Sequence, residues 1–456
     1  MYKLLSKLVM YRIEDKDSII VRLADIIRDY DKMSAVTGNA INEGNVTETG
    51  SGIYSKNTSP EELRDRIFVE VRRLLEIATS YAFDKNLWQD YLAFTIMMQE
   101  NPFALTCERK APVDGSAGGF ALSDMNIFYK LFHYDFGRIE EGLGIDTFSI
   151  ITDYKAISKR EQLFNRNVSE KVRELSTALA GAADGAEMLS KVTEFYEKYG
   201  VGMFGMNRAF RIRHDEGKDI EFIPIRNTTH VLLDDLVGYE LQKKKLRDNT
   251  EAFVAGKPAN NCLLFGDSGT GKSTSIKAII NEYYPKGLRM IELYKHEMRD
   301  LATVISMIKN RNYRFIIYMD DLSFEDFEVE YKYLKAVIEG GLEARPDNVL
   351  IYATSNRRHL IREVWSDNND VDLDKHSSDT LQEKMSLVNR FGITIGYMNP
   401  NRKEFEEIVR TLASRHPEIT MDMEQLLAEA NKWEVSHGGF SGRTAQQFVD
   451  YILGGC

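Results

Sequence analysis

The sequence is poor in the residues that build disulfide frameworks and metal clusters. Its three cysteines, Cys107, Cys262 and Cys456, lie far apart and form no CxxC pair. We therefore expect free thiols in a reducing compartment rather than structural disulfides. The eight histidines are scattered and show no spacing of the HExxH type, which argues against a metal site built from histidine and cysteine.

Long apolar runs are also missing. No segment approaches the roughly 18 uninterrupted apolar residues that are needed to cross a bilayer. The N-terminal stretch MYKLLSKLVMYRIEDKDS has a short apolar run and no small-residue cleavage site, unlike a signal peptide. We therefore expect a soluble, cytoplasmic protein with no membrane partner. The net charge of -11 argues against a protein that binds nucleic acid over its whole surface, but it does not exclude a local basic stripe.

A chain of 456 residues is too long for a single domain with one hydrophobic core. Its contents of 43% hydrophobic and 28% charged residues are typical of globular proteins. The changes of pattern along it predict three domains. Residues 1–225 form a mostly α-helical N-terminal domain of unknown role, residues 226–399 an α/β core, and residues 400–456 a C-terminal helical lid.

The N-terminal region carries helical signals and no chemical signature. Apolar residues recur at helical spacing over residues 19–30, and a polar, glycine-containing stretch over residues 34–59 predicts a loop. Ser59 is a candidate N-cap for the next helix, with Pro60 at its first position. Residues 168–199 predict two helices that are separated by AGAADGAE, and AFRIRHDEGKDIEFIPI predicts a hairpin.

After residue 226, short β-branched and aromatic runs alternate with helical patterns. This alternation predicts a parallel five-stranded sheet with helices on both faces. The expected strands are NCLLF, LRMIEL, YRFIIYM, NVLIYAT and ITIGYM.

The stretch LLFGDSGTGKSTSIKAII places a glycine-rich loop between an apolar strand and an amphipathic helix. Gly266, Gly271, Lys272 and Ser273 fit the pattern GxxxxGK[ST], in which backbone N–H groups surround phosphate oxygens beside a helix N-terminus. The alternative is a glycine-rich turn that matches by chance. The pattern predicts nucleotide contacts from Gly266, Asp267, Ser268, Gly269, Thr270, Gly271, Lys272, Ser273 and Thr274, with the Ser273 hydroxyl on Mg²⁺.

Two carboxylates end the apolar strand in RFIIYMDDLSF. Because a strand buried on both faces needs partners for such charges, we assign Asp320 to Mg²⁺ through water and Asp321 to polarising the attacking water. The alternative is an ordinary acidic turn. In the sequence, LRMIEL lies between the strand that precedes the glycine loop and the strand that carries the two acids. The acids therefore follow the third strand, as in ATPases with an added strand and unlike simple nucleotide kinases.

An ordered set of motifs carries a family resemblance: LLDDLVGYELQKKKLRDN, GDSGTGKS, YMDDLSF, YATSNRRHL, NRFGITI and GGFSGRTA. In this order the motifs resemble those of an AAA+ P-loop ATPase, and their residues are similar to those of the bacterial family catalogued as domain of unknown function 815. The resemblance covers residues 226–456 and extends only loosely to the N-terminal part. It implies an AAA+-type fold with a C-terminal helical lid, ATP and Mg²⁺.

The resemblance also implies roles for single residues near the nucleotide. Val237, Gly238 and Tyr239, in LVGYE, match the segment that packs on adenine. Asn356, in ATSN, matches the polar residue that helps to position the attacking water. The alternative for Asn356 is a simple strand end.

Two arginines match residues that act on the γ-phosphate side of the nucleotide. Arg390, in NRF, matches the arginine that a neighbouring subunit supplies, which implies a homo-oligomer with an arginine finger in trans. Arg443, in SGR, matches the lid arginine that closes over the nucleotide. Their alternatives are a surface ion pair for Arg390 and a surface position at a helix N-terminus for Arg443.

The expected function is ATP hydrolysis that drives remodelling of an unidentified protein or nucleic-acid partner. A slowly hydrolysing switch, loader or scaffold is the alternative. A small-molecule P-loop kinase is a third hypothesis. The acids on the third strand, Asn356 and the helical lid count against it.

Two charged segments have no assigned role. Residues 366–379 are typical of a solvated acidic loop or of an interaction loop, and NRRHLIR (Arg357, Arg358, His359 and Arg362) is a local basic cluster.

The pair Asp320-Asp321 departs from the Asp-Glu of most AAA+ proteins. Asp321 is one methylene shorter than glutamate, which predicts slow hydrolysis, and Glu325 is the alternative base. If Asp321 activates the water, Asp321→Asn abolishes steady-state ATP turnover while ATP binding is retained. Full turnover in this variant would remove Asp321 from the mechanism.

Overall fold

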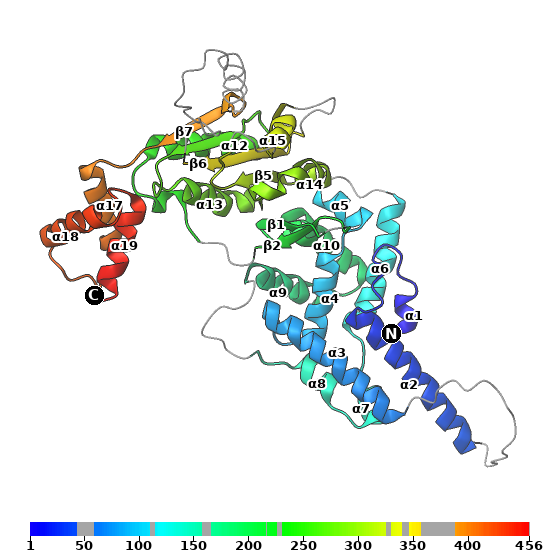
Figure 1. Cartoon of the computed structure of the whole chain (residues 1–456). Coiled ribbons are helices and arrows are strands. Elements are labelled where there is room, and N and C mark those ends of the chain that lie inside the picture. The colour runs from blue at the N-terminus through cyan, green and yellow to red at the C-terminus, as the bar shows by residue number, and fades with distance from the viewer. Residues whose placement is uncertain are drawn as a thin grey trace. The chain divides into compact units, whose positions relative to one another are not determined.

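The computed structural model describes residues 1–42, 59–109, 115–156, 166–215, 217–225, 230–324, 330–339, 346–356 and 388–455. The chain divides into two units, Met1–Asn207 and Arg208–Cys456. Figure 1 colours it from blue at the N-terminus to red at the C-terminus.

The N-terminal unit is helical, as predicted, and its helices pack around one apolar core that contains the fully buried Trp88, Phe103 and Phe128. Its helices are α1 (Tyr2–Leu5), α2 (Ile19–Asn42), α3 (Pro60–Tyr81), α4 (Leu87–Met98), α5 (Pro102–Glu108), α6 (Ser116–Phe132), α7 (Gly137–Leu143), α8 (Thr147–Thr152), α9 (Arg166–Ala180), α10 (Gly185–Tyr199) and α11 (Gly202–Met206).

Side-chain caps fix the first residues of four of these helices, α3, α4, α5 and α10. The hydroxyl of Ser59 accepts a hydrogen bond from the N–H of Glu62 at the start of α3, as the cap prediction requires. The break between α9 and α10 falls within AGAADGAE. The helix α2 differs from the prediction, because it continues to Asn42 where the sequence suggests a loop from residue 34. No proline interrupts residues 34–42, so the helical backbone can continue there.

The second unit is built on a sheet that has seven strands within the described residues, in the order β2-β1-β4-β5-β6-β3-β7. The five predicted strands form its parallel part, and β6 separates the acid-bearing β5 from the loop strand β3. This confirms the expected α/β class and the added strand. Their bounds are β3 (Cys262–Gly266), β4 (Leu288–Glu292), β5 (Arg314–Met319), β6 (Val349–Ser355) and β7 (Ile393–Tyr397).

The predicted hairpin extends this sheet instead of belonging to the helical region. Strand β1 (Ala209–Arg213) pairs antiparallel with β2 (Glu221–Pro224) and parallel with β4. The hairpin supplies hydrogen-bond partners to a β4 edge that a five-stranded sheet would leave open. The division between the units consequently follows Asn207, whereas the sequence places the boundary after residue 225.

Helices alternate with the strands as predicted: α12 (Glu240–Val254), α13 (Lys272–Tyr283), α14 (Leu301–Ile308) and α15 (Glu330–Glu339), with short 3₁₀ helices η1 (Leu233–Asp235), η2 (Tyr284–Lys286) and η3 (Lys295–Asp300). The lid helices α17 (Arg402–Ser414), α18 (Met423–Ser436) and α19 (Gly442–Leu453) share an apolar cluster of their own, and Figure 1 shows them grouped together. Among the described helices, none combines the length and the apolar character that a membrane crossing requires.

Candidate functional site

The loop between β3 and α13 has a backbone that only glycine fits comfortably. Gly266, Gly269 and Gly271 have φ angles of 132°, 78° and 91°, a region that side chains disfavour. A Cβ atom on Gly266 would lie 1.9 Å from the carbonyl oxygen of Tyr397 on the neighbouring strand. The glycines therefore let the loop turn tightly against β7 before α13 begins.

Lys272 opens α13 and folds its side chain back over this loop. Its ammonium group donates to the carbonyl oxygens of Gly266 and Asp267, at 2.9 and 2.6 Å, and to Oδ1 of Asn356 at 3.1 Å. Burial lowers the pKa of Lys272, and the carboxylates of Asp267 and Asp321 oppose that shift. The acceptors shown for this ammonium are uncharged oxygens, an arrangement suited to a site that receives an anion.

The hydroxyl of Ser273 and the acid of β5 lie side by side. Ser273 Oγ donates to Oδ1 of Asp320 at 2.7 Å, and the buried Thr354 donates to the same oxygen at 2.6 Å. Burial alone would raise the pKa of Asp320, but the hydrogen bonds from Thr354 and Ser273 outweigh it, and the pKa lies below its usual value. Asp320 is therefore held as a carboxylate.

Asp321 and Asn356 connect the acid pair to Lys272. The backbone of Asp321 is left-handed, with φ of 49°, and its N–H donates to Thr354 Oγ1 at 2.9 Å. Nδ2 of Asn356 donates to Oδ1 of Asp321 at 2.8 Å, while its amide oxygen accepts from Lys272. Residues from three parallel strands thus meet at one edge of the sheet, where carboxyl ends of strands gather.

A cavity of about 790 Å³ opens above this group, within the range of small-molecule sites. Of the predicted residues, Gly266, Asp267, Gly238 and Arg390 are not among its lining. Those that do line it are Val237, Tyr239, Ser268, Gly269, Thr270, Gly271, Lys272, Ser273, Thr274, Asp320, Asp321, Asn356 and Arg443.

The lid closes one side of the cavity through Arg443. The N–H of Arg443 donates to the carbonyl oxygen of Gly269 at 3.1 Å, and its guanidinium lies 3.5 Å from Ser268 Oγ. Tyr239 reaches the connection to the lid, because its hydroxyl donates to the carbonyl oxygen of Met398 at 2.8 Å. Burial raises the pKa of Tyr239 to about 12, so its hydroxyl remains a donor at neutral pH.

Arg390 lies at the other end of the sheet. It precedes β7, whose first residue Ile393 is in register with Cys262, whereas the last residue of β7 is in register with Gly266. A strand rises about 3.3 Å per residue, so the length of β7 separates Arg390 from the loop of its own chain.

Some predictions concern residues outside the described ranges. These are the alternative base Glu325, the basic cluster Arg357, Arg358, His359 and Arg362, and the acidic stretch 366–379.

A family model described as "Protein of unknown function (DUF815)" matches residues 206–456, more than half of the chain. The chain belongs to the DUF815 family. No curated protein sequence matches this DUF815 protein.

Solved structures with a similar fold include the Thermotoga maritima RuvB Holliday junction branch migration motor, at 17% identity and a TM-score of 0.30, covering 48% of this chain and 71% of that one. A single-substitution variant of that motor has a TM-score of 0.31 at the same identity and coverage. At these values the likeness adds no functional argument. The strand order of the sheet, the glycine loop and the helical lid confirm the predicted α/β P-loop-type fold with a C-terminal helical lid.

The sequence interpretation missed several residues that line the site of this DUF815 protein. Thr354 lies on β6, two residues before Asn356, which directly follows the strand. The alternation of an extended chain puts both on one face, a signal that could have identified Thr354. The other missed residues are Val231, Asp235, Leu236, Ile408, Leu412, Arg415, Gly442, Gln446 and Gln447.

For a site that holds ATP with Mg²⁺, as proposed below, we predict that Thr354→Val weakens this binding by about tenfold, the cost of a lost buried hydrogen bond, because Asp320 and the N–H of Asp321 both lose a partner. Thr354→Ser keeps the hydroxyl and should bind like the unchanged chain. Titration calorimetry measures both. Equal affinity in Thr354→Val and Thr354→Ser would contradict the prediction.

Proposed function

We propose that this DUF815 protein binds ATP with Mg²⁺, hydrolyses it, and uses the nucleotide state to remodel a protein or nucleic-acid partner. The main support is the continuous set of hydrogen bonds that runs from Lys272 through Asn356 to Asp321, beside a glycine loop shaped for phosphate. A glycine-rich turn without a ligand would not need an ammonium, a serine hydroxyl and two carboxylates at one edge of the sheet.

The oxygen atoms at this edge suit Mg²⁺. Ser273 Oγ and Asp320 Oδ1 lie 2.7 Å apart, and a hydroxyl with a carboxylate is a hard donor set of the kind that this ion prefers. Ser273 and Asp320 would hold the ion, with Asp320 acting through water. When bound, Mg²⁺ would neutralise negative charge on the phosphate oxygens.

The chain's own groups supply the other parts of phosphoryl transfer. Lys272 exchanges its carbonyl acceptors for the charged oxygens of the β- and γ-phosphates. Asp321 accepts the proton of the attacking water, and Asn356 holds the carboxylate of Asp321 in place by donating from Nδ2. Arg443 brings a second positive charge from the lid.

Slow hydrolysis is the second candidate, and one contact favours it. Asn356 engages Asp321 and Lys272 at the same time, so one oxygen of the short carboxylate is occupied by an amide instead of by a water molecule. A chain in this state would act as a nucleotide-dependent switch, loader or scaffold that turns over rarely.

We also propose that the protein assembles as a homo-oligomer with Arg390 acting in trans. Arg390 precedes β7, and the first residue of β7 pairs at the end of β3 that lies away from the glycine loop. In an assembly that brings this end of the sheet against the loop of a neighbouring copy, the planar fork of Arg390 would match two oxygens of the γ-phosphate.

Calorimetric titration with ATP and Mg²⁺ tests the nucleotide site. Lys272→Ala and Asp320→Ala should each weaken binding by about tenfold to a hundredfold, because each removes a charge-assisted contact. Undiminished affinity in both variants would end the proposal.

Mixing two inactive variants tests Arg390. Arg390→Ala should lower ATP turnover by about a thousandfold and keep its own nucleotide site, whereas Lys272→Ala loses the site and keeps its arginine. A mixture of the two should regain turnover that neither shows alone. Wild-type turnover of Arg390→Ala, or a silent mixture of co-assembled chains, would contradict the trans role.

A further inference from the structure

Residues 231–239, here named the wall segment, border the cavity next to the phosphate loop, where the side chain of Leu236 lies beside Gly271. Val231, Leu236, Val237 and Tyr239 contribute to the cavity lining. The segment contains one short 3₁₀ turn, η1, and ends with Gly238 and Tyr239 in left-handed backbone conformations. Such a segment has few hydrogen bonds of its own and depends on its neighbours for a fixed position.

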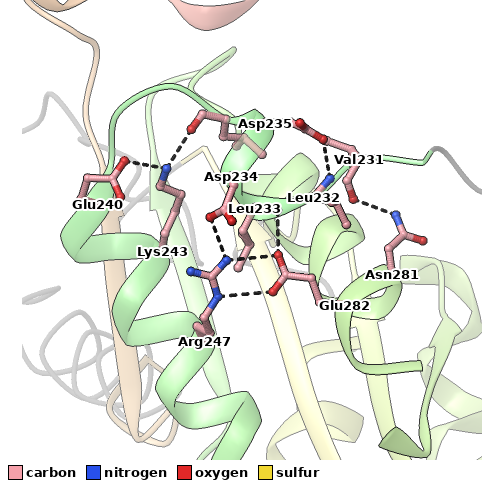
Figure 2. Close-up of polar contacts among 11 residues, drawn as sticks. Val231, Leu232, Leu233, Asp234, Asp235, Glu240, Lys243, Arg247, Asn281 and Glu282 are labelled. Atoms are coloured by element: carbon pink, nitrogen blue, oxygen red, sulfur yellow. Dashed lines mark hydrogen bonds and ion pairs between the residues drawn. The ribbon is translucent and has the colours of Figure 1, made fainter. Parts of the chain in front are cut away.

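Side chains from two helices supply those hydrogen bonds, as Figure 2 shows. Nδ2 of Asn281 donates to the carbonyl oxygen of Val231 at 2.8 Å, and the ammonium of Lys243 donates to that of Leu236 at 2.8 Å. The carboxylate of Glu282 accepts from the N–H of Leu233 at 2.9 Å. The wall segment is thus held by its backbone and by the buried side chain of Leu233, while the side chains of Val231, Leu236, Val237 and Tyr239 line the cavity.

Arg247 lies at the centre of this arrangement (Figure 2). Nε and one terminal nitrogen of Arg247 donate to the two carboxylate oxygens of Glu282, at 3.3 and 3.2 Å, and that terminal nitrogen also contacts Asp234 at 3.0 Å. Two oxygens on one guanidinium form a bidentate pair, which fixes geometry as well as charge. Arg247 therefore joins α12 and α13 to the wall segment.

Glu282 and Asn281 belong to the helix that begins with Lys272. The wall segment is consequently tied to the same rigid element that presents the phosphate ligands. A ligand with an anionic tail and an apolar, planar head would contact both parts, and the spacing between them would be fixed by α13.

We propose that Arg247 and Glu282 are positioning residues that set the affinity for the nucleoside part of the ligand, without touching it, by holding the wall segment against α13. This inference rests on the proposed nucleotide binding and adds which residues tune it. It also separates two contributions to affinity. We expect the phosphate loop to bind polyphosphate when the hold on the wall segment is weakened, whereas the base and ribose need the wall.

The test compares ADP with inorganic tripolyphosphate, both titrated with Mg²⁺ into the full chain by calorimetry. Arg247→Ala and Glu282→Ala should weaken ADP binding by about tenfold, the cost of a lost charge-assisted pair, and leave tripolyphosphate binding unchanged within about twofold. A general loss of structure would lower both affinities together, so the comparison distinguishes positioning from stability.

Lys244→Ala is the matched control, because Lys244 forms an exposed pair with Asp248 on the same helix α12 and should leave both affinities unchanged. Arg247→Lys is the mild variant, because it keeps the positive charge and loses the planar guanidinium. We expect its affinity for ADP to fall by about threefold and its affinity for tripolyphosphate to stay unchanged.

ADP binding by Arg247→Ala and Glu282→Ala that equals that of the unchanged chain would overturn the positioning role and leave the proposed function standing. An equal loss for tripolyphosphate would overturn it as well. Failure of the unchanged chain to bind ADP would instead overturn the proposed function, and this inference with it.

Discussion

The site depends on one ammonium group that is held by uncharged oxygens. Lys272 donates to two backbone carbonyls and an amide oxygen, while the nearby carboxylate Asp320 is hydrogen-bonded by Ser273 and Thr354. Opposite charges at one edge of a sheet normally pair directly. Here they are kept apart by Asn356, Ser273 and Thr354, and the space between them is where a polyanion with a divalent cation would complete the charge balance.

The sequence predicts much of this arrangement because its signals are local. A glycine loop needs its residues in one order, a buried strand reads as an apolar run, and a helix cap such as Ser59 lies within three residues of its partner. The five parallel strands and the lid helices follow from such patterns. Asp320 and Asp321 could be predicted as site residues because two acids at the end of an apolar strand need partners, and the nearby glycine loop favours an ion site over an ordinary acidic turn.

What the sequence could not supply depends on contacts between distant segments. The hairpin β1–β2 joins the edge of β4 because residues 209–211 pair with residues 290–292. No local sequence pattern specifies a pairing between segments so far apart in the chain. Arg247 and Glu282 look like ordinary helix-surface charges until α12 and α13 are side by side. The cavity lining from the lid, such as Ile408 and Leu412, reads simply as one face of an amphipathic helix.

The hydrogen bond from Tyr239 to the carbonyl oxygen of Met398 joins the wall segment to the short connection between β7 and α17. A rotation of the lid helices about this connection would have to break that bond or move Tyr239 with the lid. The position of one wall of the cavity is therefore coupled to the position of the C-terminal helices through a single hydroxyl group.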